Sequence, residues 1–475
     1  MTRRIYALGG VLAAIVSCLS AAAGFIEASP WLVPKVTQST YSYEVPKYSL
    51  PSISIEREVA GDLRAIVASA ARVEQAVNAE TRLSLPPDGL KDFYCTLVAT
   101  EGGLPLFAAG TNRPLHIASV SKLFTTTAAL LALGPEWRFE TKLFLSQDVR
   151  DGGHAESAYL VGSGDPYLVS AEFEEFWRNQ VPGGPVTRLE ELADDIARSG
   201  VRSISTLYAD SSLYDELPYP FGISQELIEQ RVLPPVSALA VDRNLVQWEK
   251  ERQAAVFASD PAYNAVARLA AALSRRGIAI RKLEKAPLRN NASYARVFAV
   301  KSAPLRELVK FVNAHSDNFA AEMLAKRVAA TEKVPGSWSG FWPRAKQLLS
   351  DIGAALENTR LDEGSGLTGN FSTCGDVTSL LVAARSGPLG EFVVKSLATP
   401  KGPGTLTGRF DGVSGAERVE AKTGSLRMVS ALAGFVEATN GSAVVFSVIS
   451  NGSDAPRAHK ELEDPLVEKL IASTN

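Results

Sequence analysis

Three short groups of residues could together perform acyl transfer through a serine. In chain order they are Ser119-Val120-Ser121-Lys122, Ser316-Asp317-Asn318 and Lys422-Thr423-Gly424-Ser425. A serine hydroxyl is a weak nucleophile at neutral pH until a base removes its proton, and a neutral lysine three residues further along a helix can be that base. Each group alone is common by chance, but the ordered set of three predicts one serine–lysine site.

The first two groups supply the nucleophile and the proton-transfer residues. Ser119 is the expected nucleophile, and Lys122 is the expected base once burial and a nearby cation lower its pKa. Lys422 is that expected cation. Ser316 is expected to relay a proton to the leaving amine. Asn318 has both a donor and an acceptor and is expected to hold a substrate amide.

The third group is expected to bind substrate. Lys422 would also hold an anionic group such as a C-terminal carboxylate, and Thr423 adds a hydroxyl to that contact. Gly424 leaves space for the substrate backbone beside a strand. The backbone N–H groups of Ser119 and Ser425 are expected to form an oxyanion hole.

The elements that must position these residues are a helix and several strands. Apolar spacing predicts a helix over 122–133, ended by Gly134 and Pro135, which places Ser119 at its first turn. Residues 93–99 and 104–108 read as a hairpin, and further strands are expected over 138–146, 157–161, 417–422, 429–437 and 442–450. Further helices are expected over 55–79, 187–199, 261–276, 305–329 and 457–472.

The long interval between Ser119 and Ser316 is more than one compact domain needs. Helices followed by late hairpin strands predict an α+β sandwich, with an antiparallel sheet built from both chain ends and flanked by helices. We therefore expect a catalytic domain over 57–150 and 299–475, with 151–298 as a large inserted accessory domain. The length of 475 residues suits such a division.

The N-terminus predicts export. Arg3 and Arg4 precede an apolar run over 5–26, so 1–29 is expected to be an export signal or anchor, followed by a Pro/Ser-rich spacer over 30–56. Three fates stay open: cleavage after Ala23, lipidation of Cys18, or retention as a membrane anchor. All three place the rest of the chain outside the cytoplasm, and the last two attach it to a membrane.

Composition argues against several other classes. The net charge of −3 with dispersed charges offers no basic field for nucleic acid. The four histidines are isolated from one another, so no metal centre is expected. A disulfide between Cys95 and Cys374 stays open, but lone cysteines mostly pack as small hydrophobic residues, so two buried free thiols are favoured.

Beyond the three groups, the chain resembles the class C low-molecular-mass penicillin-binding proteins, which are D-alanyl-D-alanine carboxypeptidases and endopeptidases. The resemblance covers about 58–470, and in that family the block between the first two motifs is an insertion. Four further segments carry the resemblance. Residues 160–166 resemble the family's Gly-rich Asp-Pro segment, and 235–239, followed by Asn244, resemble its Pro-Val-Ser-Ala-Leu stretch. Residues 362–367 resemble its Asp-Gly-Ser-Gly-Leu motif with Glu363 as an extra residue, and 404–406, followed by Arg409, resemble its Gly-Thr-Leu segment.

The resemblance implies a penicillin-binding, β-lactamase-like transpeptidase fold that acts on peptidoglycan peptides, is acylated by β-lactams, uses no cofactor and works in the periplasm or cell-wall space. It also suggests that Asp165 meets an amino group of the stem peptide. A β-lactamase or esterase on the same fold is one alternative, but no loop with a second base for deacylation is recognisable. A non-catalytic cell-wall binding protein is another, against which the filled motif positions argue.

Overall fold

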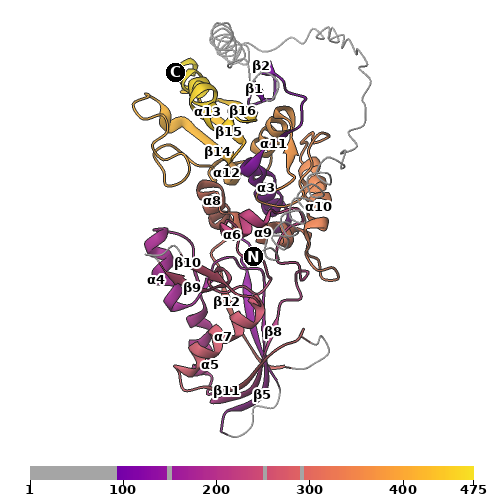
Figure 1. Cartoon of the computed structure of the whole chain (residues 1–475), viewed down its shortest axis with the longest axis vertical. Helices are drawn as coiled ribbons and strands as arrows, with labels where there is room; N and C mark the ends of the chain where they lie inside the picture. Colours follow the sequence, from indigo (N-terminus) through magenta and orange to yellow (C-terminus); the bar gives the residue numbers. More distant parts are fainter. Residues whose placement is uncertain (1–93, 147–151, 250–253, 289–293, 475) are drawn as a thin grey trace, which may run out of the picture. The chain divides into compact units, whose positions relative to one another are not determined.

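A five-stranded antiparallel sheet is assembled from both ends of the described chain (Figure 1). The computed structural model describes residues 94–146, 152–249, 254–288 and 294–474. The expected export segment, the spacer and the helix over 55–79 lie outside these residues. Among the described helices, none is long and apolar enough to cross a membrane.

The first sheet has the strand order β14-β15-β16-β1-β2. Its strands are β1 (Tyr94–Thr100), β2 (Pro105–Ala109), β14 (Val419–Leu426), β15 (Val429–Glu437) and β16 (Ala443–Asn451). The expected hairpin and the three late strands are thus confirmed, as is the assembly from both chain ends. In the register of the β14–β15 pair, Lys422 lies opposite Ala433.

Helices cover both faces of this sheet, which is why β15 and β16 are apolar along nearly their whole length. Ala431, Ala433 and Phe435 point into a core with α3, α8, α9 and α11. Their neighbours Leu432 and Val436 point into a second core with α14. These helices are α3 (Ser121–Leu133), α8 (Leu305–His315), α9 (Asn318–Ala329), α11 (Cys374–Ser386) and α14 (Asp464–Ser473).

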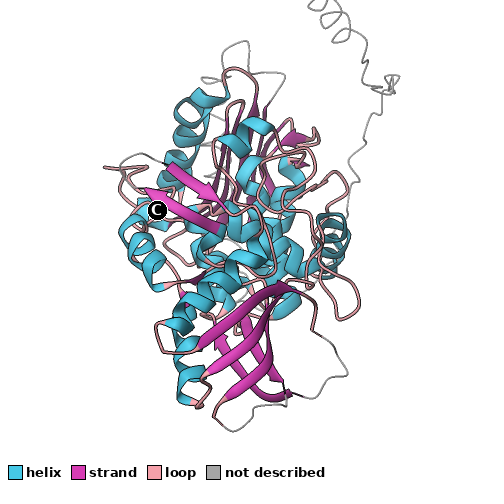
Figure 2. Ribbon diagram, turned by 60° about the horizontal axis from the view of Figure 1, so that its bottom comes forward, coloured by secondary structure: helices cyan, strands magenta, loops and turns pink. Residues whose placement is uncertain are grey.

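A second five-stranded sheet has the order β11-β8-β5-β4-β12. Its strands are β4 (Glu140–Ser146), β5 (His154–Val161), β8 (Ser203–Asp210), β11 (Ala279–Lys285) and β12 (Tyr294–Lys301). β5 and β11 run parallel to β8, whereas β4 pairs antiparallel with β5 and β12. The helices α5 (Leu189–Arg198) and α7 (Pro261–Ser274) pack on this sheet, and Figure 2 shows helices beside the strands of both sheets.

Strand pairing differs from the expected inserted block at both ends, since β12 continues past residue 298 to Lys301. β4 lies before residue 151, yet it pairs within the second sheet, antiparallel to both β5 and β12, and every second residue of β4 is buried. By strand pairing the inserted part therefore begins near Glu140 rather than at 151. The division into domains itself stays a prediction.

The remaining helices and strands of the described chain belong to neither five-stranded sheet. They are β3 (Leu115–His116), η1 (Ala118–Val120), β6 (Leu168–Val169), α4 (Ala171–Gln180), β7 (Thr187–Arg188), α6 (Gln225–Glu229), η2 (Asp242–Asn244), β9 (Leu245–Glu249), β10 (Ala254–Phe257), α10 (Trp338–Asp351), β13 (Phe371–Ser372), α12 (Gly390–Val394), η3 (Ala416–Arg418), α13 (Ala455–Ala458) and the π-helical turn η4 (His459–Glu463).

The two cysteines of the described chain form a disulfide. Cys95 on β1 and Cys374 at the start of α11 are joined, with their Cα atoms 5.9 Å apart. The favoured expectation of two free thiols is therefore wrong. The preference for apolar packing predicted the burial of both residues correctly, but it could not show that the fold brings them together.

Candidate active site

Ser119 lies in a one-turn 3-10 helix, η1, directly before α3. The preceding residue, Ala118, has a φ of +44°, a value that a non-glycine residue rarely adopts. This tight turn delivers Ser119 to the start of α3, so the expected position at a helix start is confirmed. Lys122 Nζ donates a hydrogen bond of 2.8 Å to Ser119 Oγ.

Lys122 is completely buried and its ammonium group has three acceptors. Besides Ser119, Nζ donates to Asn318 Oδ1 at 2.7 Å and to the Ser365 carbonyl oxygen at 2.6 Å. Burial lowers the pKa of Lys122 to about 8, because a charged amine is poorly solvated there, while the negative charges of Glu363 and Asp317 oppose the shift. The residue can therefore lose its proton near neutral pH.

The second group joins two helices at a break that the sequence anticipated. Ser316 ends α8 in the left-handed conformation, with φ +58°, and Asp317 caps α9 by accepting from the Ala320 N–H. Asn318 is the first residue of α9. The break turns Ser316 and Asn318 toward the two lysines: Ser316 Oγ accepts from Lys422 Nζ at 3.0 Å.

The middle residue of this group is held by the inserted part of the chain. Arg243 donates to both carboxylate oxygens of Asp317, at 2.7 and 2.8 Å, and the hydroxyl of Tyr167 donates to it at 3.2 Å. Burial disfavours ionisation of Asp317, but the Arg243 charge and these hydrogen bonds hold its pKa below the usual value. Neither Arg243 nor Tyr167 could be predicted from the sequence as a partner of Asp317.

Lys422 lies on β14 and is also completely buried. Its Nζ donates to Ser316 Oγ and, at 2.7 Å, to the Thr423 carbonyl oxygen. Burial and then the charge of Lys122 lower its pKa well below the usual value. We expected burial and the charge of Lys422 together to lower the pKa of Lys122, and burial is the largest cause of the lowered pKa for both lysines.

The rest of the third group lies along β14 beside Ser119. A Cβ added to Gly424 would lie 2.7 Å from the Ile117 carbonyl oxygen and 3.2 Å from the Ser119 nitrogen. Glycine therefore lets the strand pass close to the turn that carries Ser119. Thr423 donates to the Thr405 hydroxyl at 2.7 Å, and Ser425 is exposed on the same strand.

A glycine-rich turn closes the back of the site. Glu363 accepts from the Ser365 N–H at 3.0 Å, from the Ser365 hydroxyl at 2.6 Å and from the Gly366 N–H at 2.7 Å. Gly366 has a φ of +92°, and a Cβ there would lie 1.9 Å from the Ala118 carbonyl oxygen. Only glycine fits here against the turn formed by Ala118 and Ser119. Glu363 had been noted only as an extra residue in this segment.

A second buried carboxyl group supports the same turn. Glu322 on α9 accepts from Trp338 Nε1 at 2.7 Å and from the Gly364 N–H at 2.9 Å. Burial and the adjacent Glu363 raise the pKa of Glu322 well above its usual value. Burial also disfavours charge on Glu363, but hydrogen bonds from Glu322, Ser365 and Gly366 outweigh it and lower its pKa. Glu322 is thus the neutral acid and Glu363 the carboxylate of the pair.

Asp165 is buried and is linked to the second group only through Tyr167. Its Oδ1 accepts from the Tyr167 N–H at 2.9 Å, and the hydroxyl of that tyrosine reaches Asp317. Burial raises the pKa of Asp165 to about 6. In the part of the chain that the structure describes, no three His, Cys, Asp or Glu residues are grouped so that they could hold a metal ion.

Comparison with known proteins identifies a family over most of the chain. A model of the D-Ala-D-Ala carboxypeptidase 3 (S13) family matches residues 95–256 and 249–472. A D-alanyl-D-alanine carboxypeptidase of Actinomadura sp. (strain R39) is 27% identical over 448 residues, covering 79% of this chain and 80% of that protein. Carboxypeptidase DacB of Mycolicibacterium smegmatis is 28% identical over 364 residues, covering 74% and 75%.

Solved structures show the same fold. The crystal structure of penicillin binding protein 4 (dacB) from Haemophilus influenzae matches with a TM-score of 0.66 at 21% identity, covering 83% of this chain and 99% of that one. A second structure of that protein, complexed with a novel β-lactam, matches with a TM-score of 0.62 at 20% identity, covering 84% and 97%. The expected α+β penicillin-binding fold is confirmed.

Proposed function

Since the chain belongs to the D-Ala-D-Ala carboxypeptidase 3 (S13) family of serine peptidases, the class C low-molecular-mass penicillin-binding proteins, we propose that it removes the terminal D-alanine from peptidoglycan stem peptides through an acyl-enzyme on Ser119. The observation that carries the proposal is the 2.8 Å hydrogen bond between Lys122 Nζ and Ser119 Oγ in a buried setting that lowers the pKa of the lysine. A weak nucleophile is thereby paired with a base that is available near neutral pH.

The reaction begins with the neutral form of Lys122. Its Nζ takes the Ser119 Oγ proton while Oγ bonds to the carbonyl carbon of the penultimate D-alanine. The C–N bond to the terminal D-alanine then breaks, and the leaving amine receives the proton that Lys122 took from Ser119, relayed through the Ser316 hydroxyl, so that Lys122 is neutral again. In the resting site that hydroxyl accepts a hydrogen bond from Lys422. Water attacks the resulting ester, which releases the shortened peptide and returns the proton to Ser119.

The two lysines divide their tasks when substrate binds. Both have lowered pKa values in a shared buried site, so a second charge there is unfavourable. The C-terminal carboxylate of the substrate would lie near Lys422 and Thr423 and favour the charged form of Lys422. Lys122 is then the lysine that stays neutral and serves as the base.

The remaining residues hold the reacting amide. The N–H groups of Ser119 and Ser425 would bind the oxyanion, and the close approach of β14 to the Ser119 nitrogen at Gly424 supports this role. Asn318 would bind a substrate amide with the NH₂ group that it does not use on Lys122.

A contact between Asp165 and an amino group of the stem peptide stays a prediction. Its support is the carboxylate's place next to Tyr167, which touches Asp317 of the second motif. Because Asp165 is 2% exposed, the contact would need the side chain to open toward the site. An Asp165→Asn variant with an unchanged KM for a diamino-acid-containing peptide would count against it.

Acylation by β-lactams follows from the same chemistry, because their amide carbonyl can take the place of the peptide carbonyl at Ser119. The family acts on the cell wall, so this chain acts outside the cytoplasm. Export and membrane attachment by residues 1–29 remain proposals that rest on the charged and apolar pattern of that segment.

The activity is tested with purified muropeptides and mass spectrometry. A pentapeptide monomer should lose one D-alanine, and a cross-linked dimer shows whether endopeptidase activity accompanies it. Ser119→Ala should abolish both reactions, whereas the matched control Ser339→Ala, at an exposed serine, should retain them. Retained release of D-alanine by Ser119→Ala would refute the proposal, and dimer left intact by an active protein would reject the endopeptidase role.

A further inference from the structure

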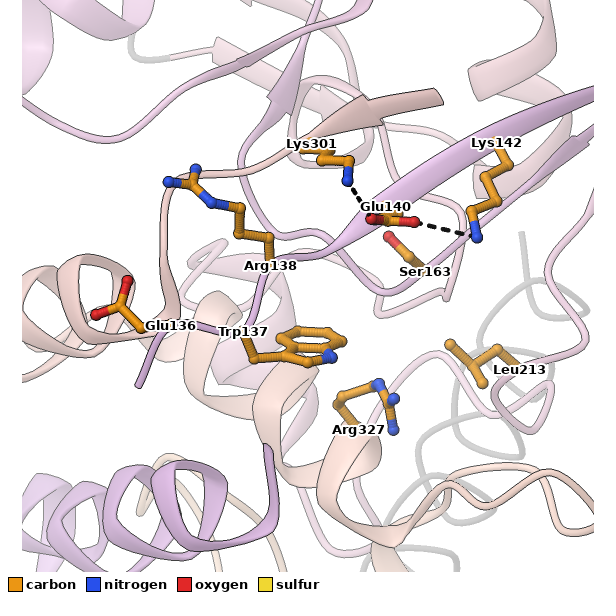
Figure 3. A pocket seen from close by; sticks show the side chains of 9 residues that line it. All are labelled: Glu136, Trp137, Arg138, Glu140, Lys142, Ser163, Leu213, Lys301 and Arg327. Carbon is orange, nitrogen blue, oxygen red and sulfur yellow. Dashed lines mark ion pairs between the residues drawn. The ribbon is translucent and has the colours of Figure 1, made fainter. Parts of the chain in front are cut away.

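A pocket of about 460 Å³ lies between the second sheet and α9, apart from the serine–lysine site (Figure 3). The start of β4 and the end of β12 form one side, and the last turns of α9 and three loops form the rest. Nine residues line it: Glu136, Trp137, Arg138, Glu140, Lys142, Ser163, Leu213, Lys301 and Arg327. The reaction proposed above uses none of them.

The pocket has an excess of positive charge. Four of its residues are cationic and two are carboxylates. Glu140 is already shared by two lysines, with 2.7 Å to Lys301 and 3.1 Å to Lys142, and Glu136 is paired with an arginine outside the lining. Within the described ranges, Arg327 has no carboxylate partner. The guanidinium of Arg327 is therefore available to an anionic ligand.

An aromatic side chain lies beside this free cation. The guanidinium carbon of Arg327 is 5.1 Å from the centre of the Trp137 ring, and Figure 3 shows both side chains on one side of the pocket, opposite Ser163 and Glu140. An indole offers a flat apolar surface to a ring, while Ser163 adds a hydroxyl that can donate and accept. A cleft with one aromatic surface and a few polar groups is typical of small-ligand sites.

The location relates the pocket to the proposed reaction. α9 begins at Asn318, which contacts Lys122, and Arg327 lies nine residues further along the same helix. At about 1.5 Å per residue, the helix spans roughly 13 Å between them. A repeating wall polymer bound at Ser119 therefore has another of its units within reach of this pocket.

We propose that this pocket is a second binding site for an acidic glycopeptide unit of peptidoglycan, with a sugar ring on Trp137 and a carboxylate on Arg327. The inference rests on the proposed function, because it takes the same polymer as the substrate. It goes beyond that function in assigning a separate site that performs no chemistry and holds the polymer while Ser119 acts on one stem peptide.

The test is calorimetric titration of the full chain with N-acetylmuramyl-L-alanyl-D-glutamate, which has a sugar ring and carboxylates but no D-Ala-D-Ala bond. The protein is first acylated with penicillin to block Ser119. Saturable binding is expected, and Arg327→Gln should weaken it at least about tenfold, since a hydrogen bond to a charged group is lost. Arg344→Gln, at an exposed arginine on α10, is the matched control and should bind as the unchanged protein does.

Two comparison ligands separate the components of recognition. An N-acetylglucosamine oligomer has the ring without the carboxylate, and inorganic phosphate has charge without the ring; both should bind much more weakly than the glycopeptide. Equal binding by phosphate would reduce the pocket to a simple anion site and overturn the proposal. Absence of saturable binding, or equal affinity in Arg327→Gln, would also overturn it.

Two further controls keep the result interpretable. Lys142→Gln serves as a second variant if Arg327→Gln does not fold, and it should also weaken binding. If penicillin fails to acylate Ser119, the proposed function fails. Titration of the unacylated protein, with and without Arg327→Gln, then still decides whether the pocket binds the glycopeptide.

Discussion

Removal of the negative charge of Glu363 is expected to shift the pH dependence of Ser119 acylation to lower pH. Burial lowers the pKa of Lys122 to about 8, and the largest opposing influence is the charge of Glu363. Replacement by glutamine removes that charge and keeps a side chain of nearly the same size. The pKa of Lys122 should therefore fall further, which leaves more of the base form at acidic pH.

The size of the effect follows from the fraction of neutral Lys122. With a pKa of about 8, about one tenth is neutral at pH 7 and about one hundredth at pH 6, so the rate should fall about tenfold per pH unit below 8. A nearby opposite charge typically moves a pKa by about 1–3 units. Glu363→Gln should therefore shift the acidic limb of the pH–rate profile, the part where the acylation rate falls with pH, by about one pH unit to lower pH. At pH 6 the acylation rate, relative to its maximum, should rise about tenfold.

The assay is the second-order rate constant for acylation by a fluorescent penicillin between pH 5.5 and 9.5. The rate constants of each variant are divided by that variant's own value on the high-pH plateau, because loss of the hydrogen bonds to Ser365 and Gly366 will lower the absolute rate. Glu322→Gln is the matched control. Because Glu322 is the neutral acid of the pair, an amide there leaves the charge near Lys122 unchanged, and the acidic limb of the pH–rate profile should not shift.

Two results would refute this reasoning. An acid limb that stays at the same pH in Glu363→Gln would show that the carboxylate does not set the pKa of the base. An equal shift in both variants would show that the shift comes from disturbed packing. Lys422 and Asp317 also face the site, and both are unchanged in these variants.

Three further predictions concern the framework of the site. Arg243→Ala leaves Asp317 buried without its cation and should lower the free energy of unfolding by about 3–5 kcal/mol in chemical denaturation. The pKa of Asp317 is lower in the folded protein than in the unfolded chain. The loss of unfolding free energy in Arg243→Ala should therefore be largest above the unfolded-chain pKa of Asp317 and should shrink as the pH falls toward its folded-state pKa. A loss that is the same at every pH would contradict this. Gly366→Ala should slow penicillin acylation at least about a hundredfold, since its Cβ would collide with the turn that carries Ser119, and a near-normal rate would refute the close packing. Replacing Cys95 and Cys374 by serine should lower the free energy of unfolding by about 2–5 kcal/mol, and equal stability with and without reductant would argue against the disulfide.

The convergence of the three motifs could be predicted from sequence because each is a local pattern. Ser119 and Lys122 share one helix start, Ser316 and Asn318 flank one helix break, and Lys422 lies on a strand with a clear apolar pattern. The order of these elements matched a known arrangement, so their meeting in space did not have to be calculated from the residues alone.

The supporting contacts could not be predicted, because they join residues that are distant in the chain. Arg243 meets Asp317 across the inserted part, and Glu322 meets Glu363 across α10. A single sequence carries no signal for such pairs beyond unusual residues near a motif, of which Glu363 was one. The pairing of β4 with the second sheet also depends on non-local contacts, which local patterning cannot assign.

The most direct test of the account is mass spectrometry of the protein after incubation with benzylpenicillin. We predict an increase equal to the mass of the intact antibiotic, located by peptide mapping at Ser119, absent from Ser119→Ala and strongly slowed in Lys122→Met. An adduct on another residue, or one that persists in Ser119→Ala, would contradict the central claim that Lys122 activates Ser119 as the nucleophile.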